Sequence, residues 1–450
     1  MAEFLSSIFR RPQSSAPRQQ ENRQLEILMA KIRSCIFRRR QSSARRHRPW
    51  SWEIEAEGEE QAGVCAQNNL LISLHDDLLF KILLNLSAED IYRASLACRS
   101  LYYRTILSEK FVNLHFRQTE EYDLLFRFSY APTHELIAFL VSMKQGSVTV
   151  SDYKSIFIFD TSCNGLILQH NSVIRVVNPV TGRSFRLPPI PKNAMLTRCC
   201  LGYSEVSKAY KVTLAYIARR RGPRRAILTV GVDKSWRDLG TVIVDKLWSY
   251  LGTDRLMEFA NTLGRPLVTE SFIHGRPLVT EGFIHFIYGD TVLTLNVETE
   301  VITETRVPLL FPVYPPKYMR WYLSTGKALT LVVRFEDGLF RVWEMVLSGN
   351  CYYWREWERQ IVLESRLQEV REVCGDKYRP VGWLQQMEVL VFEGLSEKWR
   401  CTVMFYVVIA TGEIGWISTP ISKGLVGKFY RISDRVLPHK NTLVQLEGYH

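Results

Sequence analysis

The sequence contains no run of eighteen apolar residues, so we expect no helix that crosses a membrane. It also lacks a secretory signal of the usual form, because the apolar stretch 4–9 is short and Arg10 and Arg11 follow it rather than precede it. A beginning rich in Arg and Ser and poor in acids also suits an organelle transit peptide, which stays open as the alternative.

Cysteine patterns typical of metal sites or disulfide frameworks are missing. The nine cysteines are odd in number and form no C-x-x-C pair. Cys199 and Cys200 are adjacent, which suits a structural zinc site poorly. Reduced thiols in a cytosolic or nuclear protein are the simpler interpretation, and we expect no metal site.

Signatures of catalysis and cofactor binding are also missing. The sequence has no glycine-rich dinucleotide or phosphate loop and no G-x-S-x-G motif. His134 and Glu135 open the zinc pattern H-E-x-x-H, but Ala138 stands where the second histidine is needed. Catalytic sites assemble in three dimensions, so these absences favour a non-catalytic protein without a cofactor but do not require one.

Positive charge is concentrated in the first fifty residues. They hold twelve Lys and Arg against three Glu, which accounts for nine of the net charge of +12. Residues 1–62 are polar and end in an acidic run, so we predict a disordered arm. Because the remaining chain is nearly neutral, nucleic acid is the weaker choice of partner. One basic cluster is a candidate nuclear-import signal or nucleic-acid patch, or simply a solvated tail: Arg38, Arg39, Arg40, Arg45, Arg46 and Arg48. We expect the protein in the nucleus and the cytoplasm.

Residues 70–116 are predicted to form a small helical unit. Ser73 with Asp76, and Ser87 with Asp90, fit the pattern that starts a helix. Apolar residues recur every three or four positions and give one broad apolar face. Three short helices cannot bury this many apolar residues among themselves, so the unit needs the rest of the chain or a partner.

From about residue 145 the pattern changes to short β-strands separated by turns. One sequence pattern occurs three times: a strand, a turn near a threonine and a second strand. It covers residues 173–189, 291–308 and 403–417. Asp337 and Gly338 predict a fourth hairpin. Recurring hairpins over this length favour a propeller, with a large β-sandwich as the alternative. We predict four parts: an arm at 1–62, helices at 70–116, a linker or helical connection at 117–144 and a β domain at 145–450.

Two local features of the β domain stand apart. Residues 264–274 return almost unchanged as 275–285, and we interpret the first copy as a duplicated insertion. A basic run around Gly222 and Pro223 is predicted to lie on an exposed hairpin loop. It is either a solvated loop or a binding site for an acidic or phosphorylated substrate, with the candidates Arg219, Arg220, Arg221, Arg224 and Arg225.

The helical segment resembles an F-box, the docking element of ubiquitin-ligase receptors. The matched positions are Leu74, Asp77, Leu78, Ile82, Leu83, Leu86, Cys98, Arg99 and Phe111. The departures are His75, Ser87 and Leu101, where the pattern has Pro, Pro and Trp. Later phrases at 159–167, 177–189, 201–212, 235–237 and 438–444 resemble, in this order, the plant F-box-associated domain.

This resemblance implies an α+β multidomain protein, a small helical F-box followed by a large all-β domain. It implies the substrate-recognition subunit of an SCF-type cullin–RING ubiquitin ligase, in which the β domain captures a protein for ubiquitination and proteasomal degradation. The F-box would dock on the Skp-type adaptor, unless the same residues are internal core, through Leu74, His75, Asp77, Leu78, Ile82, Leu83 and Leu86. The alternative is a nuclear scaffold or nucleic-acid-associated protein that uses the basic arm.

Overall fold

The computed structural model divides the chain into two compact units, Met1–Gln118 and Thr119–His450. The arm at 1–62, Leu74, His75 and the first copy of the duplication lie outside the described residues. No helix within the described ranges is long and apolar enough to span a membrane. The structure describes residues 76–97, 99–118, 122–129, 136–144, 147–153, 159–170, 173–191, 194–218, 222–240, 277–288, 291–307, 319–335, 339–348, 351–358, 361–362, 367–375, 377–396, 401–418, 435–444 and 446.

The described part of the first unit is helical. The Ser87 hydroxyl accepts a hydrogen bond from the Asp90 backbone N–H at 3.2 Å and donates one to the Asp90 carboxylate at 3.0 Å, so the predicted cap is present. Ser108 caps the last helix in the same way, accepting from the Phe111 N–H at 3.3 Å. The helices are α4 (Asp76–Leu84), α5 (Ala88–Ala97), α6 (Arg99–Thr105) and α7 (Glu109–Gln118).

Phe111 lies at the centre of this helical unit. Its ring is fully buried and meets the Phe80 ring edge to face, with 5.2 Å between centroids. One turn further along α7, the buried His115 places Nε2 2.9 Å from the Leu86 carbonyl oxygen. Leu101, the residue at the position of the missing tryptophan, is buried as well. Aromatic packing joins α7 to α4, and the contact of His115 joins α7 to the turn that follows α4.

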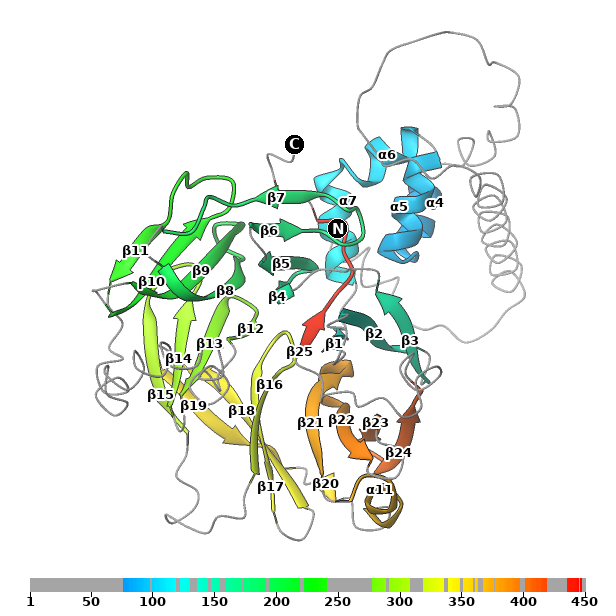
Figure 1. Cartoon of the computed structure of the whole chain (residues 1–450). Helices are drawn as coiled ribbons and strands as arrows, with labels where there is room; N and C mark the ends of the chain where they lie inside the picture. Colours follow the sequence, from blue (N-terminus) through cyan, green and yellow to red (C-terminus); the bar gives the residue numbers. More distant parts are fainter. Residues whose placement is uncertain are drawn as a thin grey trace, which may run out of the picture. The chain divides into compact units, whose positions relative to one another are not determined.

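The second unit is a six-bladed β-propeller, which confirms the predicted all-β domain and excludes the sandwich (Figure 1). Each blade is antiparallel, and the first strands of neighbouring blades contact one another. Blade 1 is β25 (Arg435–His439), β1 (Asp123–Ser129), β2 (Leu136–Lys144) and β3 (Ser147–Tyr153); blade 2 is β4 (Phe159–Cys163), β5 (Leu166–His170), β6 (Ile174–Val177) and β7 (Ser184–Arg186); blade 3 is β8 (Ala194–Ser204), β9 (Ala209–Ala218), β10 (Gly222–Thr229) and β11 (Arg237–Gly240).

The other three blades follow in chain order. Blade 4 is β12 (Leu278–Thr280), β13 (Phe283–Tyr288), β14 (Thr291–Asn296) and β15 (Ile302–Arg306); blade 5 is β16 (Met319–Ser324), β17 (Leu329–Arg334), β18 (Leu339–Ser348), β19 (Cys351–Glu356) and β20 (Ile361–Val362); blade 6 is β21 (Tyr378–Leu384), β22 (Val389–Ser396), β23 (Cys401–Val408) and β24 (Glu413–Ile417). Helix α11 (Leu367–Cys374) precedes blade 6, and the short helix η2 (Gln385–Met387) lies within it.

Apolar side chains hold neighbouring blades together. Every adjacent pair of blades shares a cluster of buried residues, including blades 6 and 1, so the ring is closed by packing. Between blades 5 and 6, for example, the fully buried Phe340, Phe392 and Phe405 lie against one another. Burying both faces of each sheet in this way is the main source of the unit's stability.

The predicted turn phrase recurs in blades 2, 4 and 6. In each, a threonine hydroxyl accepts a hydrogen bond from the backbone N–H two residues later: Thr181 from Arg183, Thr299 from Val301 and Thr411 from Glu413. The hairpins at 173–189, 291–308 and 403–417 are therefore confirmed, as are the pairing of the strands around Asp337 and the strand Phe283–Tyr288.

The segment 117–144, expected as a linker or helical connection, instead holds β1 and β2 of blade 1. That prediction was wrong because these strands are covered on both faces. Leu124, Leu125 and Phe126 are successive residues, and each is at most 1% exposed. A strand buried on both sides has a continuous apolar run instead of a two-residue alternation, and periodicity alone does not distinguish it from a buried helix.

The end of the chain closes the ring onto blade 2. Strand β25 pairs with β1, and its last residue with those that follow, 439–444 and 446, forms what we call the closing segment. His439 Nδ1 lies 2.8 Å from the Ser162 hydroxyl in blade 2. The buried Asn178 side-chain amide donates to the carbonyl oxygens of Thr442 at 3.0 Å and Val444 at 2.7 Å. The closing segment is thus tied to strand β4 and to the turn after β6 of blade 2.

Candidate interaction surfaces

The structure buries most of the predicted adaptor-binding residues that it describes. Ile82, Leu83 and Leu86 are each at most 8% exposed, so they belong to the core of the helical unit. Asp77 is exposed on α4. Leu74, His75 and the Leu78 side chain lie outside what the structure describes. A partner that binds the folded helical unit would therefore contact side chains other than Ile82, Leu83 and Leu86.

Four large apolar side chains of the helical unit are exposed instead. They are Leu96 at 57%, Tyr103 at 52%, Leu107 at 49% and Leu114 at 42%. Sequence reasoning missed them because it counted the strongest apolar stripe, and the strongest stripe is the one that the unit buries. Their signal in the sequence is weak, since Leu96, Tyr103 and Leu114 are apolar residues on the polar sides of their helices and Leu107 lies between α6 and α7.

Arg224 and Arg225, two of the five arginines of the predicted basic loop, lie in strand β10. Gly222 and Pro223 lie in β10, opposite Ala218 and Ile217, so they do not form the turn; a proline is tolerated at the start of a strand. Arg225 is only 5% exposed, with its guanidinium 4.2 Å from the centre of the Phe286 ring.

Arg224 of the same run pairs with Asp238 on the next strand, and this hydrogen bond raises the pKa of its guanidinium. Arg219, Arg220 and Arg221 lie outside the described residues. Arg224 and Arg225 therefore serve contacts within the propeller, which corrects their assignment to a substrate-binding loop.

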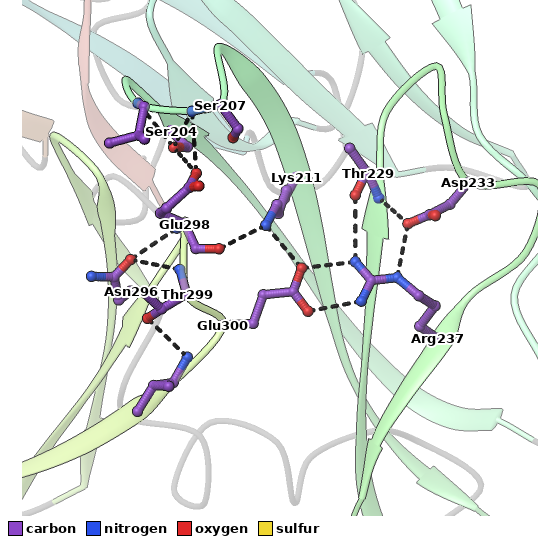
Figure 2. A network of polar contacts seen from close by, with 12 residues as sticks. Ser204, Ser207, Lys211, Thr229, Asp233, Arg237, Asn296, Glu298, Thr299 and Glu300 are labelled. Atoms are coloured by element: carbon purple, nitrogen blue, oxygen red, sulfur yellow. Dashed lines mark hydrogen bonds and ion pairs between the residues drawn. The ribbon is translucent and has the colours of Figure 1, made fainter.

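A network of polar contacts ties blade 3 to blade 4 (Figure 2). It joins three turns that lie at the same edge of the two sheets: β8–β9, β10–β11 and β14–β15. We call it the turn network. Its members are Ser204, Ser207, Lys211, Thr229, Asp233, Arg237, Asn296, Glu298, Thr299 and Glu300.

Glu300 is the centre of the turn network. Its carboxylate accepts two hydrogen bonds from the Arg237 guanidinium, both 2.8 Å, and one from Lys211 Nζ, also 2.8 Å. The same Lys211 ammonium donates to the Glu298 carbonyl oxygen at 3.1 Å. Arg237 is fixed from its other side, because its Nε donates to Asp233 at 3.0 Å. One carboxylate of blade 4 thus binds two cations of blade 3.

These contacts shift the ionisation of the carboxylates. Hydrogen bonds from Arg237 lower the pKa of Glu300, and the Ser204 hydroxyl lowers that of Glu298. Burial pulls the pKa of Asp233 upward, but hydrogen bonds from Thr229 and Arg237 outweigh burial and leave it lowered. The three carboxylates are therefore fully ionised at neutral pH, and the network is a set of charge pairs.

Two residues of these turns have unusual backbone conformations. Glu300 has φ of 59° and Lys208 has φ of 55°, values that favour glycine. At the positions equivalent to Glu300 in blades 2 and 6, the chain has Gly182 and Gly412, with φ of 71° and 66°. In blade 4 the side chain at this position strains the backbone, and its contacts with Lys211 and Arg237 offset that strain.

We expect Glu300→Ala to lower the free energy of unfolding by about 2 kcal/mol, because it leaves the nearly buried Lys211 without its carboxylate. Glu300→Gly should cost less, since glycine relieves the positive φ. Glu304→Ala is the matched control, because the Glu304 side chain is 57% exposed. Urea denaturation followed by tryptophan fluorescence measures all three variants. Equal midpoints for Glu300→Ala and Glu304→Ala would show that the network does not stabilise the blades.

Among the described residues, no group of three or more His, Cys, Asp or Glu is placed to hold a metal ion. The buried thiols of Cys163 and Cys200 have raised pKa values, chiefly because burial disfavours the thiolate. These thiols are therefore poor nucleophiles.

Comparison with solved structures gives matches at low similarity. A post-proline cleaving enzyme from Rickettsia typhi has 8% identity and a TM-score of 0.31, and the match covers 66% of this chain and 42% of that one. TolB from Acinetobacter baumannii has 8% identity and a TM-score of 0.35, covering 69% and 65%. The periplasmic gluconolactonase PpgL from Pseudomonas aeruginosa has 13% identity and a TM-score of 0.31, covering 66% and 82%. Likeness this low carries no statement about function.

No curated protein matches the sequence. A family model does match part of it, at residues 113–249, which run from within α7 through strands β1 to β11. The family is described as the F-box associated beta propeller domain. The propeller found in the structure agrees with that description, and the match supports an F-box-associated domain in this chain.

Proposed function

We propose that the chain is the substrate-recognition subunit of an SCF-type cullin–RING ubiquitin ligase, without a catalytic step of its own. The observation that carries the proposal is the order of its parts. A helical unit with the F-box pattern comes directly before a propeller whose strands β1 to β11 match the F-box-associated family. In such a receptor the helices dock on a Skp-type adaptor, and the propeller captures the protein to be ubiquitinated.

The helical unit supports this role through its exposed apolar side chains. A unit this small keeps Ile82, Leu83 and Phe111 for its own core, as the structure shows. Leu96, Leu107 and Leu114 remain exposed, and exposed leucines contribute binding energy when a partner covers them. We therefore assign adaptor contact to these three residues in addition to Asp77, which the resemblance implies.

We expect the purified wild-type chain to bind a Skp-type adaptor, and Leu96→Asp, Leu107→Asp and Leu114→Asp together to weaken binding at least tenfold. The reason is that three exposed apolar contacts are replaced by charges that must stay hydrated. Co-purification and isothermal titration calorimetry measure the effect, with circular dichroism to confirm that the helices persist.

Leu347→Asp on blade 5 is the matched control, because Leu347 is 48% exposed but lies in the propeller. Ile82→Asp should also abolish binding, but through loss of helix, because Ile82 is 7% exposed. The proposal fails if the wild-type chain does not bind the adaptor at all. The assignment of surface residues alone fails if the triple variant binds like wild type.

A further inference from the structure

Three exposed valines lie on the turns that the turn network holds together. Val206 is 79% exposed, Val232 is 72% exposed and Val301 is 56% exposed. They are the three most exposed large apolar side chains among the described residues of the propeller. A β-branched residue at an exposed turn contributes little to the fold, and turns usually hold Gly, Asn, Asp or Ser. The fold itself therefore does not explain these side chains.

The turn network places the three valines at one edge of blades 3 and 4. Val206 precedes Ser207, whose backbone N–H donates to Glu298 at 3.3 Å. Val232 precedes Asp233, which binds Arg237. Val301 follows Glu300, which binds the same Arg237 (Figure 2). Each valine is thus next in sequence to a residue whose side chain or backbone takes part in the network.

The network also fixes the turns before any partner arrives. Each of the three turns is anchored by side chain to backbone hydrogen bonds: the Ser204 hydroxyl accepts from Val206 at 3.2 Å, Asp233 accepts from Thr229 at 2.7 Å and Asn296 accepts from Glu298 at 2.8 Å. A surface that is already ordered loses little conformational entropy on binding. Apolar side chains held on ordered turns are typical of a recognition surface.

Charge at this edge indicates what kind of segment fits. The three turns and their strand ends, residues 204–211, 229–238 and 296–301, contain five carboxylates and four cations, and Arg224 pairs with the fifth carboxylate, Asp238. Glu205 pairs with Lys208 at 2.5 Å, and Lys211 and Arg237 are bound to Glu300. The charges are balanced and mostly used within the surface, so it offers no net attraction to an acidic or basic partner.

Area indicates how large the partner segment is. Three partly exposed valine side chains offer roughly 200 Å² of apolar surface, against the ~800 Å² per partner that a stable protein–protein interface needs. A second copy of the chain would not be held by so small a patch. A short segment of a partner protein matches it, with apolar side chains spaced to reach successive turns.

We propose that Val206, Val232 and Val301 form a docking surface for a short, uncharged, apolar peptide segment of a partner protein. The inference rests on the proposed function, in which this unit selects the substrate, and it places that selection on the edge of blades 3 and 4. It is a candidate substrate site separate from Arg224 and Arg225, which serve contacts within the propeller.

The test pans the full chain against a phage-displayed library of random twelve-residue peptides. We expect enriched peptides with apolar side chains and a net charge near zero. Their retention should fall at least tenfold on the variant Val206→Asp, Val232→Asp, Val301→Asp, and also fall on the milder variant with threonine at all three positions. The matched control, Met319→Asp with Leu347→Asp on blade 5, should retain them like wild type.

The inference is overturned if no peptide is enriched, if the enriched peptides are charged, or if the valine variants retain them unchanged. Thermal unfolding of the threonine variant should match wild type, which separates lost binding from lost fold. Adaptor binding is measured on the same variants. An intact adaptor contact with no peptide binding refutes only the valine surface, whereas peptide binding without adaptor contact refutes the receptor role and leaves the surface standing.

Discussion

Replacing Gly165 by alanine should lower the free energy of unfolding by about 3–5 kcal/mol, a large share of the ~5–15 kcal/mol typical of a folded protein. Gly165 lies at the turn between β4 and β5, where the closing segment crosses blade 2. A Cβ atom there would lie 2.1 Å from the Thr442 side chain and 2.3 Å from the Lys440 carbonyl oxygen. The second of these is backbone, so no rotamer change relieves the clash.

Two costs combine at Gly165, and a second glycine separates them. Gly165 has φ of +79°, a conformation that costs any other residue about 1 kcal/mol. Gly182 has φ of +71°, with nothing within 4 Å of an added Cβ, so Gly182→Ala carries the conformational cost alone. The difference between the two variants in urea denaturation is therefore the cost of pushing the closing segment away from blade 2.

A third variant checks the interpretation. Asn178→Ala removes the amide that donates to Thr442 and Val444, and so loosens the same segment without a clash. It should cost about 2–3 kcal/mol, and its effect should be less than additive with that of Gly165→Ala, because both act on one contact. If Gly165→Ala costs no more than Gly182→Ala, the closing segment does not hold the ring as described.

The hairpins were predictable because their signals are local. An Asn, a Thr and a residue with positive φ within five positions make a turn wherever they occur, and Asn178, Thr181 and Gly182 do so in blade 2. The strands β1 and β2 were not predictable from periodicity, because Leu124 to Phe126 are buried by blades that lie far away in the sequence. The six-bladed closure likewise depends on β25 pairing with β1, a contact between the two ends of the domain.

The candidate sites likewise depend on contacts between segments that are distant in the sequence, which local signals do not reveal. Charge runs such as 219–225 are visible in the sequence, but whether an arginine is free or used depends on its neighbours, and Arg225 packs against Phe286 of another blade. Glu300 had no signal as a site, since a carboxylate in a turn is ordinary; its place opposite Lys211 and Arg237 is a property of two blades together. The sequence does hold one clue, because Glu300 stands where the equivalent turns of blades 2 and 6 have Gly182 and Gly412.

Lowering the pH from 7 to 5 should destabilise the propeller by about 4 kcal/mol, because two buried histidines must stay neutral in the folded state. His285 is 1% exposed and lies between the hydroxyls of Thr280 at 2.8 Å and Thr294 at 3.0 Å. Burial lowers its pKa to about 3. His439 is fully buried between Ser162 and Asn441, and burial lowers its pKa to about 4, although the hydrogen bond with Asn441 acts in the opposite direction.

The direction of the effect follows from proton uptake. Both folded-state pKa values lie below the ordinary value of 6.5, so below pH 6.5 the unfolded chain binds protons that the folded chain does not. The stability that neutral histidine provides is therefore complete above pH 6.5 and is lost as the pH falls toward 4. At pH 5 the solution is about 1.5 pH units below the ordinary histidine pKa, so each buried histidine lowers the free energy of unfolding by about 2 kcal/mol. Unfolding at this pH takes up about two protons. The lowered pKa of Glu300 adds to the loss only at still lower pH.

Urea denaturation at pH 8, 6.5 and 5 measures this dependence. His285→Gln and His439→Gln each remove a titrating ring but keep a side chain that forms hydrogen bonds, so each variant should be less stable at pH 8 and lose about half of the pH dependence. The double variant should have a nearly flat profile between pH 6.5 and 5. Glu304→Ala removes an exposed carboxylate and should keep the wild-type slope.

A wild-type midpoint that does not change between pH 6.5 and 5 would mean that these rings are hydrated or protonated in the folded protein. A steep profile that survives in the double variant would instead assign the pH dependence to carboxylates.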